Sequence, residues 1–162
     1  MRFIKLLSAI LLLLLIIVVG FYFKAKFFLL PSMEAPRNES AFRGYRELKI
    51  KDRVFKLEVA DSEAKRTSGL SGRDSLPADQ GMLFVFEKSA RYGFWMKDMK
   101  FPIDIIWFNR GRVVYIVENA PPDNSYQPAV YNPTFDADSA LELRAGEVRR
   151  LGIKTGDILS WE

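Results

Sequence analysis

The longest apolar stretch of the chain runs from Leu6 to Phe23 and contains no charged residue. A helix rises about 1.5 Å per residue, so this stretch would span roughly 27 Å, close to the hydrocarbon thickness of a bilayer. Basic residues flank it on both sides, at Arg2, Lys5, Lys24 and Lys26. We therefore predict that residues 1–30 form a single transmembrane anchor with basic flanks. The slight basic excess before the stretch favours a cytoplasmic N-terminus.

A cleaved signal peptide is the alternative interpretation of this stretch. Such a peptide has a shorter apolar region, with small residues directly after it. Here the stretch ends on bulky aromatic residues, and the nearest small residues, around Ser32–Ala35, are interrupted by Met33 and Glu34. Either interpretation places the rest of the chain in the periplasm or outside the cell.

The pattern after the anchor is mainly that of short strands. Residues 31–47 contain Pro, Ser, Glu and Asn, which is typical of a linker. Residues 48–162 are then one domain. Alternating or continuous apolar runs predict strands over 54–59, 81–86, 92–96, 103–108, 112–118, 140–143 and 158–161.

Two short helices and one tight turn interrupt these strands. Asp61 is a good N-cap and Gly69 a good C-terminal stop, so residues 62–68 are predicted to be helical. A second helix is predicted over 147–151. Asn109-Arg110-Gly111 predicts a hairpin between its two flanking strands. Residues 120–135 contain several prolines and predict a long loop.

The order of these elements predicts the fold class. Strands do not alternate with long helices, so a doubly wound parallel sheet is not expected. We predict a mainly β (α+β) domain, a compact and mostly antiparallel barrel or sandwich with two short helices, preceded by one transmembrane helix.

Composition and charge narrow the possible functions. The chain has no histidine and no cysteine, which excludes Ser-His-Asp triads and Cys-His dyads and removes the preferred ligands of zinc. The net charge is +4, but Arg2, Lys5, Lys24, Lys26 and Glu34 precede residue 37, so residues 37–162 carry 20 basic and 19 acidic side chains. A nearly neutral domain does not favour nucleic acid as a partner.

Several motifs together resemble domain-of-unknown-function family 192, a family of small bacterial and archaeal proteins. The most specific is Phe94-Trp-Met-Lys97, and the others are Glu58-Val-Ala-Asp61, Gly69-Leu70, Arg73, Gly81–Phe86, Pro102, Asp104–Ile106, Glu118–Pro121, Leu141–Leu143, Ala145-Gly146 and Gly152–Asp157. The resemblance covers roughly residues 50–160. It implies a compact β-rich fold, often behind a signal peptide or anchor, and it implies no activity.

This sequence departs from the family pattern at two places. Asp98-Met99 stands where members commonly carry Asn-Thr, and the cysteine that some members carry after the Glu118–Pro121 block is absent. Both departures count against a mechanism that would need those groups.

The densest group of polar and aromatic residues lies around Trp95, Lys97 and Asp104. If this stretch is a strand, Trp95 and Lys97 share one face. Because an unpaired lysine is rare in a core, Asp104 would be the partner of Lys97. A folding ion pair beside a core tryptophan and a ligand pocket both remain open. Glu118 and Asn119 end a strand beside a loop, where sites are common. We predict a ligand surface of Trp95, Lys97, Asp104, Glu118 and Asn119.

We predict neither a metal nor a cofactor. Asp123, Asn124, Asp136 and Asp138 could offer oxygen ligands to Ca²⁺, but they lack the spacing of a known calcium loop.

These observations leave three hypotheses about function. The first is a non-catalytic binding or accessory module of the cell envelope, held in the membrane by residues 6–23, with an envelope glycan as its ligand. The second is a carboxylate-based hydrolase acting on such a glycan, with Asp104 and Glu118 as the pair of carboxyl groups. The third is a structural partner of another membrane protein. The missing histidine and cysteine favour a chain that is not an enzyme.

Overall fold

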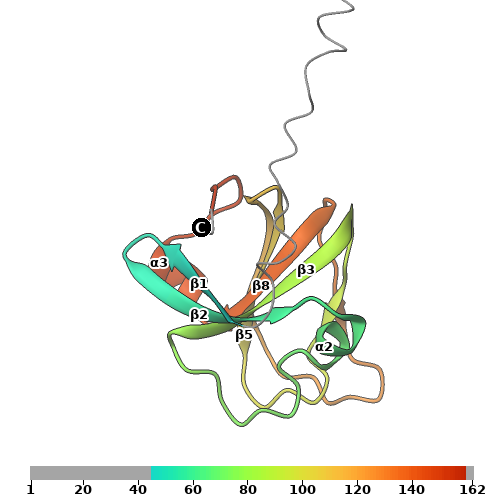
Figure 1. The fold of residues 1–162 in the computed structure, drawn as a ribbon. Coiled ribbons are helices and arrows are strands. Elements are labelled where there is room, and N and C mark those ends of the chain that lie inside the picture. Colours follow the sequence, from blue (N-terminus) through green and yellow to red (C-terminus); the bar gives the residue numbers. More distant parts are fainter. Residues whose placement is uncertain (1–44, 160–162) are drawn as a thin grey trace, which may run out of the picture. The chain divides into compact units, whose positions relative to one another are not determined.

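The computed structural model describes residues 45–159, and the predicted anchor and cleavage region lie outside them. A six-stranded sheet has the order β1-β2-β3-β8-β5-β6, and Figure 1 labels five of its strands, β1, β2, β3, β8 and β5. A separate two-stranded sheet pairs β4 with β7. The strands are β1 (Tyr45–Ile50), β2 (Arg53–Ala60), β3 (Gln80–Ala90), β4 (Phe94–Trp95), β5 (Ile103–Asn109), β6 (Arg112–Ala120), β7 (Val130–Tyr131) and β8 (Ala137–Arg144). The helices are α2 (Glu63–Ser68) and α3 (Glu147–Leu151). Within this range, neither helix has the length and apolar character needed to cross a membrane.

The large sheet is mixed and open. β2 and β3 are parallel, with α2 in the connection between them, and every other neighbouring pair is antiparallel. The predicted β-rich, mostly antiparallel fold with two short helices is therefore confirmed. β1 and β6 are the two outer strands and do not pair with each other, so the sheet is not closed and the predicted barrel is not confirmed.

Both faces of the sheet are buried, because its strands carry apolar residues at successive positions. In β8, Ala140 belongs to one cluster, which we name the first core, while Leu141 and Leu143 belong to the other, the second core. The first core also contains Met82, Phe84, Phe94, Met96, Met99, Ile105 and Trp107. The second core contains Leu57, Leu83, Ile106, Phe108 and Val148 of α3. Successive side chains of a strand point to opposite faces of the sheet. A polar residue in a strand therefore faces the first or the second core according to the cluster of the residues two positions away.

The first helix is capped one residue later than predicted. Ser62, and not Asp61, is the N-cap, because its Oγ accepts a hydrogen bond from the backbone N–H of Lys65 at 3.4 Å. Asp61 instead forms an ion pair with Lys65 at 2.9 Å. Gly69 ends the helix with a φ of 49°, as predicted from the preference of glycine for the left-handed region.

Three segments differ from the sequence prediction. β1 begins at Tyr45, inside the predicted linker, and is recruited by antiparallel pairing with β2. β7 lies inside the predicted long loop, where only two residues pair with β4. Near the C-terminus, the described part of the predicted strand 158–161 is reduced to an isolated bridge between Ile158 and Arg112.

Candidate functional site

Trp95 and Lys97 lie together at the surface above the first core. In β4, Phe94 is buried in the core while the next residue, Trp95, is 48% exposed. Lys97 is also exposed, and its Nζ lies 5.9 Å from the centroid of the Trp95 ring. This cation–π contact holds a positive charge over an accessible aromatic face. Val130, the partner of Trp95 across the small sheet, is exposed as well.

Two neighbouring loops hold the segment that carries Lys97. The carbonyl oxygen of Lys97 accepts a hydrogen bond from Ser71 Oγ at 2.9 Å, and that of Asp98 accepts one from the backbone N–H of Gly72 at 2.8 Å. From the other side, Asn124 Oδ1 accepts a bond from the backbone N–H of Asp98 at 3.0 Å. The backbone under Lys97 is therefore fixed by contacts that leave its side chain free to meet a ligand.

Asp104 does not form the predicted ion pair with Lys97. It is fully buried on the face of β5 opposite to Ile103 and Ile105, which both belong to the first core. Its Oδ1 accepts a hydrogen bond from the backbone N–H of Asn119, and its Oδ2 accepts one from Val148, each at 2.8 Å. Asp104 therefore ties β6 and α3 to β5, and it is satisfied without a cation.

Glu118 and Asn119 are exposed at the end of β6, next to Asp104. Glu118 Oε2 lies 3.6 Å from Arg149 Nε of α3. Asn119 adopts a φ of 54°, which aims its backbone N–H at Asp104. The five predicted site residues thus separate into two groups. Trp95 and Lys97 lie above the first core, and the other three surround the start of α3.

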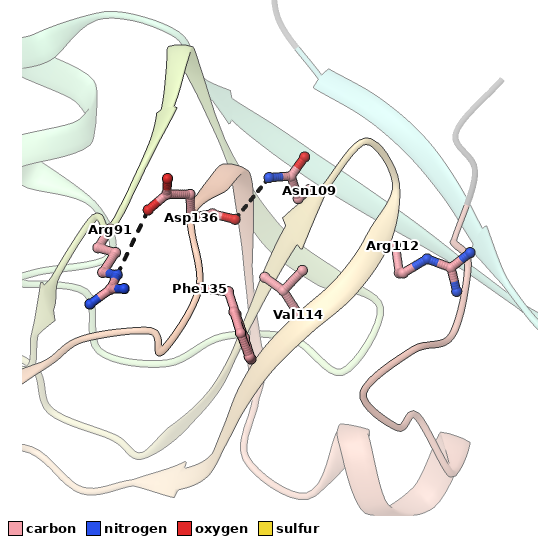
Figure 2. Close-up of a pocket in the computed structure, with 6 residues that line it drawn as sticks. All are labelled: Arg91, Asn109, Arg112, Val114, Phe135 and Asp136. Carbon is pink, nitrogen blue, oxygen red and sulfur yellow. Dashed lines mark hydrogen bonds and ion pairs between the residues drawn. The ribbon is translucent and has the colours of Figure 1, made fainter.

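A shallow depression of about 510 Å³ opens near the β5–β6 hairpin (Figure 2). It is lined by Arg91, Asn109, Arg112, Val114, Phe135 and Asp136. Asp136 lies 3.7 Å from Arg91 Nε, and its carbonyl oxygen accepts a hydrogen bond from Asn109 Nδ2 at 2.9 Å. Of the other oxygen ligands considered for Ca²⁺, Asp123 accepts bonds from the backbone N–H groups of Ser125 and Ala129. These aspartates hold loops in place.

Glu142 carries a buried carboxyl group and was not among the site residues predicted from the sequence. It occupies the position in β8 that faces the first core, two residues from Ala140, and is 5% exposed. Its Oε2 has no hydrogen-bond partner in the described part of the chain. Burial raises the pKa of Glu142 to about 8, and the positive charge of Arg73 opposes this rise. Glu142 therefore keeps its proton at neutral pH.

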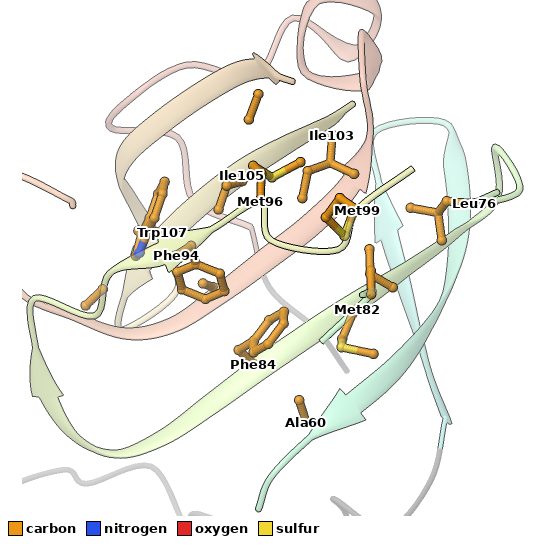
Figure 3. Packing of buried hydrophobic residues seen from close by; sticks show 14 of the residues in the cluster. Ala60, Leu76, Met82, Phe84, Phe94, Met96, Met99, Ile103, Ile105 and Trp107 are labelled. Carbon is orange, nitrogen blue, oxygen red and sulfur yellow. The ribbon is translucent and has the colours of Figure 1, made fainter. Parts of the chain in front are cut away.

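An ion pair lies beside this protonated carboxyl group. Arg73 Nη2 is 2.7 Å from Glu58 Oε2. In the sheet, Glu58 is the register partner of Met82, and Met82 is the register partner of Glu142. Met82 itself is buried among the apolar side chains of the first core (Figure 3). The arrangement places a buried neutral acid, which can donate a hydrogen bond, beside the ion pair of Glu58 and Arg73.

The sequence contained one indication that Glu142 could be buried. Glu142 lies between Leu141 and Leu143 in a predicted strand, so it had to face away from both. Nothing in that pattern says whether the opposite face is solvent or a second core.

Comparison with known proteins identifies the family. The model of DUF192, described as an uncharacterized ACR, matches residues 46–161. The chain is similar to a Novosphingobium aromaticivorans protein of unknown function, with 31% identity and a TM-score of 0.64, over 72% of this chain and 84% of that one. It is also similar to a Sinorhizobium meliloti protein described as a putative transcription regulator, with 32% identity and a TM-score of 0.63, over 72% and 91% of the two chains. Comparison with curated proteins gives no match.

Proposed function

This chain belongs to the DUF192 family, and on that premise we propose that it is a membrane-anchored binding module of the cell envelope that does not catalyse a reaction. Residues 6–23 anchor it, the N-terminus is cytoplasmic, and the β domain lies in the periplasm or outside the cell. The support for this location is the uncharged apolar stretch with its basic flanks.

The observation that carries the binding proposal is the pair formed by Trp95 and Lys97. A tryptophan that is 48% exposed, next to a lysine 5.9 Å from its ring centroid, offers one apolar face and one charge to a ligand. Aromatic side chains of this kind are enriched at binding surfaces because they combine a large apolar area with little conformational freedom to lose. An envelope glycan fits this chemistry, since a sugar ring has an apolar face and a polar rim.

We propose a smaller ligand surface than the one predicted from the sequence. Trp95 and Lys97 form its centre, and the exposed side chain of Val130 extends it. Asp104 is removed from it, because both of its carboxylate oxygens accept backbone hydrogen bonds inside the domain. Glu118 and Asn119 belong to the group around α3, so they are expected to contribute little to this surface.

The positions of Asp104 and Glu118 also argue against the hydrolase hypothesis, which needs both as catalytic carboxyl groups. A glycosidase needs two carboxyl groups that face one substrate across about 5–10 Å. Asp104 is buried under backbone donors, and Glu118 is exposed in an ion pair with Arg149. No reaction is therefore proposed for these two residues.

We propose no role in transcription for this chain, although the similar Sinorhizobium protein is described as a putative transcription regulator. Residues 37–162 carry 20 basic and 19 acidic side chains, and recognition of nucleic acid usually requires a strongly basic face.

A pull-down on purified peptidoglycan, together with a glycan array, tests the proposal with the full chain in detergent. We expect Trp95→Ala to reduce binding by about tenfold or more, and Lys97→Ala to reduce it less, because aromatic anchors dominate binding energies. Phe135→Ala and Lys154→Ala are matched controls, since each removes an exposed side chain elsewhere on the domain. Equal retention of wild type and Trp95→Ala would refute this surface. Co-purification of one stoichiometric membrane protein, without glycan binding, would favour a structural partner instead.

A further inference from the structure

β6 is an outer strand of the large sheet, and its middle is unusually apolar for an exposed edge. Val113-Val-Tyr-Ile-Val117 contains no charged residue and no proline. Val114, Tyr115, Ile116 and Val117 are each only half-buried. Natural edge strands normally carry lysine, proline or a cover, because an apolar edge with open hydrogen-bonding groups attracts another strand.

The first residues of β6 already have a cover. The backbone N–H of Val113 donates to the carbonyl oxygen of Asp157, and the N–H of Gly156 donates back to Val113, each at 2.8 Å. Beyond Val113, no other described backbone segment bonds to this side of β6. This leaves a free edge, Val114–Glu118, with Ile116 at its midpoint.

We propose that the free edge of β6 pairs with the same edge of a second copy of this chain, antiparallel and centred on Ile116. Such a two-fold interface uses the same patch on both copies. This register uses the whole free edge and leaves the 156–159 segment in place. It sets Ile116 opposite Ile116 and, twice, Tyr115 opposite Val117. Aromatic and β-branched residues in opposite positions are among the favourable cross-strand pairs.

The charges at the two ends of the free edge are complementary. Val114 lies at one end, where it lines the depression together with Arg91, Arg112 and Asp136. Asp136 is paired with Arg91 at 3.7 Å, so Arg112, which donates to the carbonyl oxygen of Gly156, carries the net positive charge of this end. Glu118 lies at the other end, and its only described partner, Arg149, is 85% exposed and holds it weakly. Antiparallel pairing brings Glu118 of each copy to the arginine-bearing end of the other. A parallel or shifted arrangement would lose this match.

The absence of cysteine makes a direct test possible in the full chain. In the proposed register, a cysteine at position 116 lies opposite itself, at a spacing that a disulfide can bridge. We expect Ile116→Cys in detergent to form a disulfide-linked dimer under mild oxidation at least about tenfold faster than Lys154→Cys, an exposed control outside the free edge. Equal rates for the two variants would overturn the proposal.

A second measurement tests the register and guards against misfolding of one variant. Tyr115→Cys and Val117→Cys chains are expected to cross-link to each other when mixed, and more slowly when each is alone. Light scattering should give a dimer mass for wild type and a monomer mass for Val117→Lys, which sets a charge against the partner edge. A monomeric wild type would also overturn the pairing, and cross-linking of Tyr115→Cys mainly to itself would overturn the register.

Discussion

Glu142 of β8 lies opposite Met82 of β3, a buried residue of the first core. Oε2 of Glu142 has no hydrogen-bond partner among the residues that the structure describes, although Arg73 is close enough to influence the ionisation of Glu142. An ionised carboxylate at this position would be stabilised mainly by that one guanidinium group, which is already paired with Glu58.

The pH dependence of stability should therefore depend on Glu142. The pKa of Glu142 in the folded chain is about 8, against 4.5 for an ordinary glutamate. Between these values the folded state keeps a proton that the unfolded state releases, so stability falls as pH rises. Below pH 4.5 and above pH 8 the two states carry the same charge at this residue, and the effect is constant. At 1.36 kcal/mol per pH unit the total loss is roughly 5 kcal/mol.

Glu142→Gln should remove this loss. We expect thermal unfolding of the variant, followed by circular dichroism, to vary little between pH 5 and pH 8 in comparison with wild type. Asp79→Asn, at an exposed position, is the control and should keep the wild-type profile. Parallel profiles for wild type and Glu142→Gln would show that Glu142 is ionised in the folded chain.

Replacing Arg73 should move this transition to higher pH. The charge of Arg73 lowers the pKa of Glu142, so Arg73→Gln is expected to raise that pKa further. The lost ion pair with Glu58 should itself cost less than about 1 kcal/mol, because both side chains are about one-third exposed. ¹³C NMR of the glutamate carboxyl carbons measures the pKa directly. Lys100→Gln, which breaks the exposed pair with Asp74, should leave it unchanged.

Asp104→Ala should be strongly destabilising even though Asp104 is not expected to touch a ligand. The substitution leaves the N–H groups of Asn119 and Val148 without their acceptor. Two backbone donors left without an acceptor suggest a cost of roughly 3–5 kcal/mol in the free energy of unfolding. Asp79→Ala should cost less than about 0.5 kcal/mol. A denaturant titration that gave similar midpoints for the two variants would contradict this role.

Replacing Gly81 or Gly93 with alanine should lower the stability of the domain to different extents. A Cβ at Gly81 would lie 2.6 Å from the carbonyl oxygen of Glu142, a backbone atom in the middle of the sheet. A Cβ at Gly93 would lie 2.5 Å from Asn132 Oδ1 and 2.6 Å from Val130 Cγ1, which belong to exposed side chains and not to the backbone of the large sheet. We expect Gly81→Ala to cost about 1–3 kcal/mol more than Gly93→Ala in the same denaturant titration. Equal costs would mean that the sheet can widen at Gly81.

The local pattern of apolar and polar residues predicted most of the long strands of the domain. It did not predict which strands lie next to each other in the sheet. The β5–β6 hairpin was predictable because Asn109-Arg110-Gly111 fixes the turn and joins adjacent strands. The position of β8 between β3 and β5 was not, because no local signal encodes a partner far along the chain. β7 was missed because its two residues lie in a proline-containing loop and pair only with β4.

The candidate site was predictable only in part, because some of its contacts join residues that are far apart in the sequence. Trp95 and Lys97 are near neighbours in sequence, so their contact follows from one segment. Asp104 was assigned to Lys97 because an unpaired lysine is rare in a core, but Lys97 is exposed and Asp104 is buried without its cation. Backbone N–H groups of Asn119 and Val148 supply the same stabilisation, and only the folded arrangement of β6 and α3 brings them there.

The central place of β8 determines the order in which the chain can complete its sheet. β1, β2 and β3 can associate early, and so can the β5–β6 hairpin, but β8 alone joins these two halves. During synthesis, which starts at the N-terminus, the edges of β3 and β5 that pair with β8 stay exposed until the chain has been made up to Arg144. Such long-range completion slows folding and leaves apolar strands accessible to chaperones or to aggregation. A chain cut before Ala137 would keep both halves and lose the strand that makes them one domain.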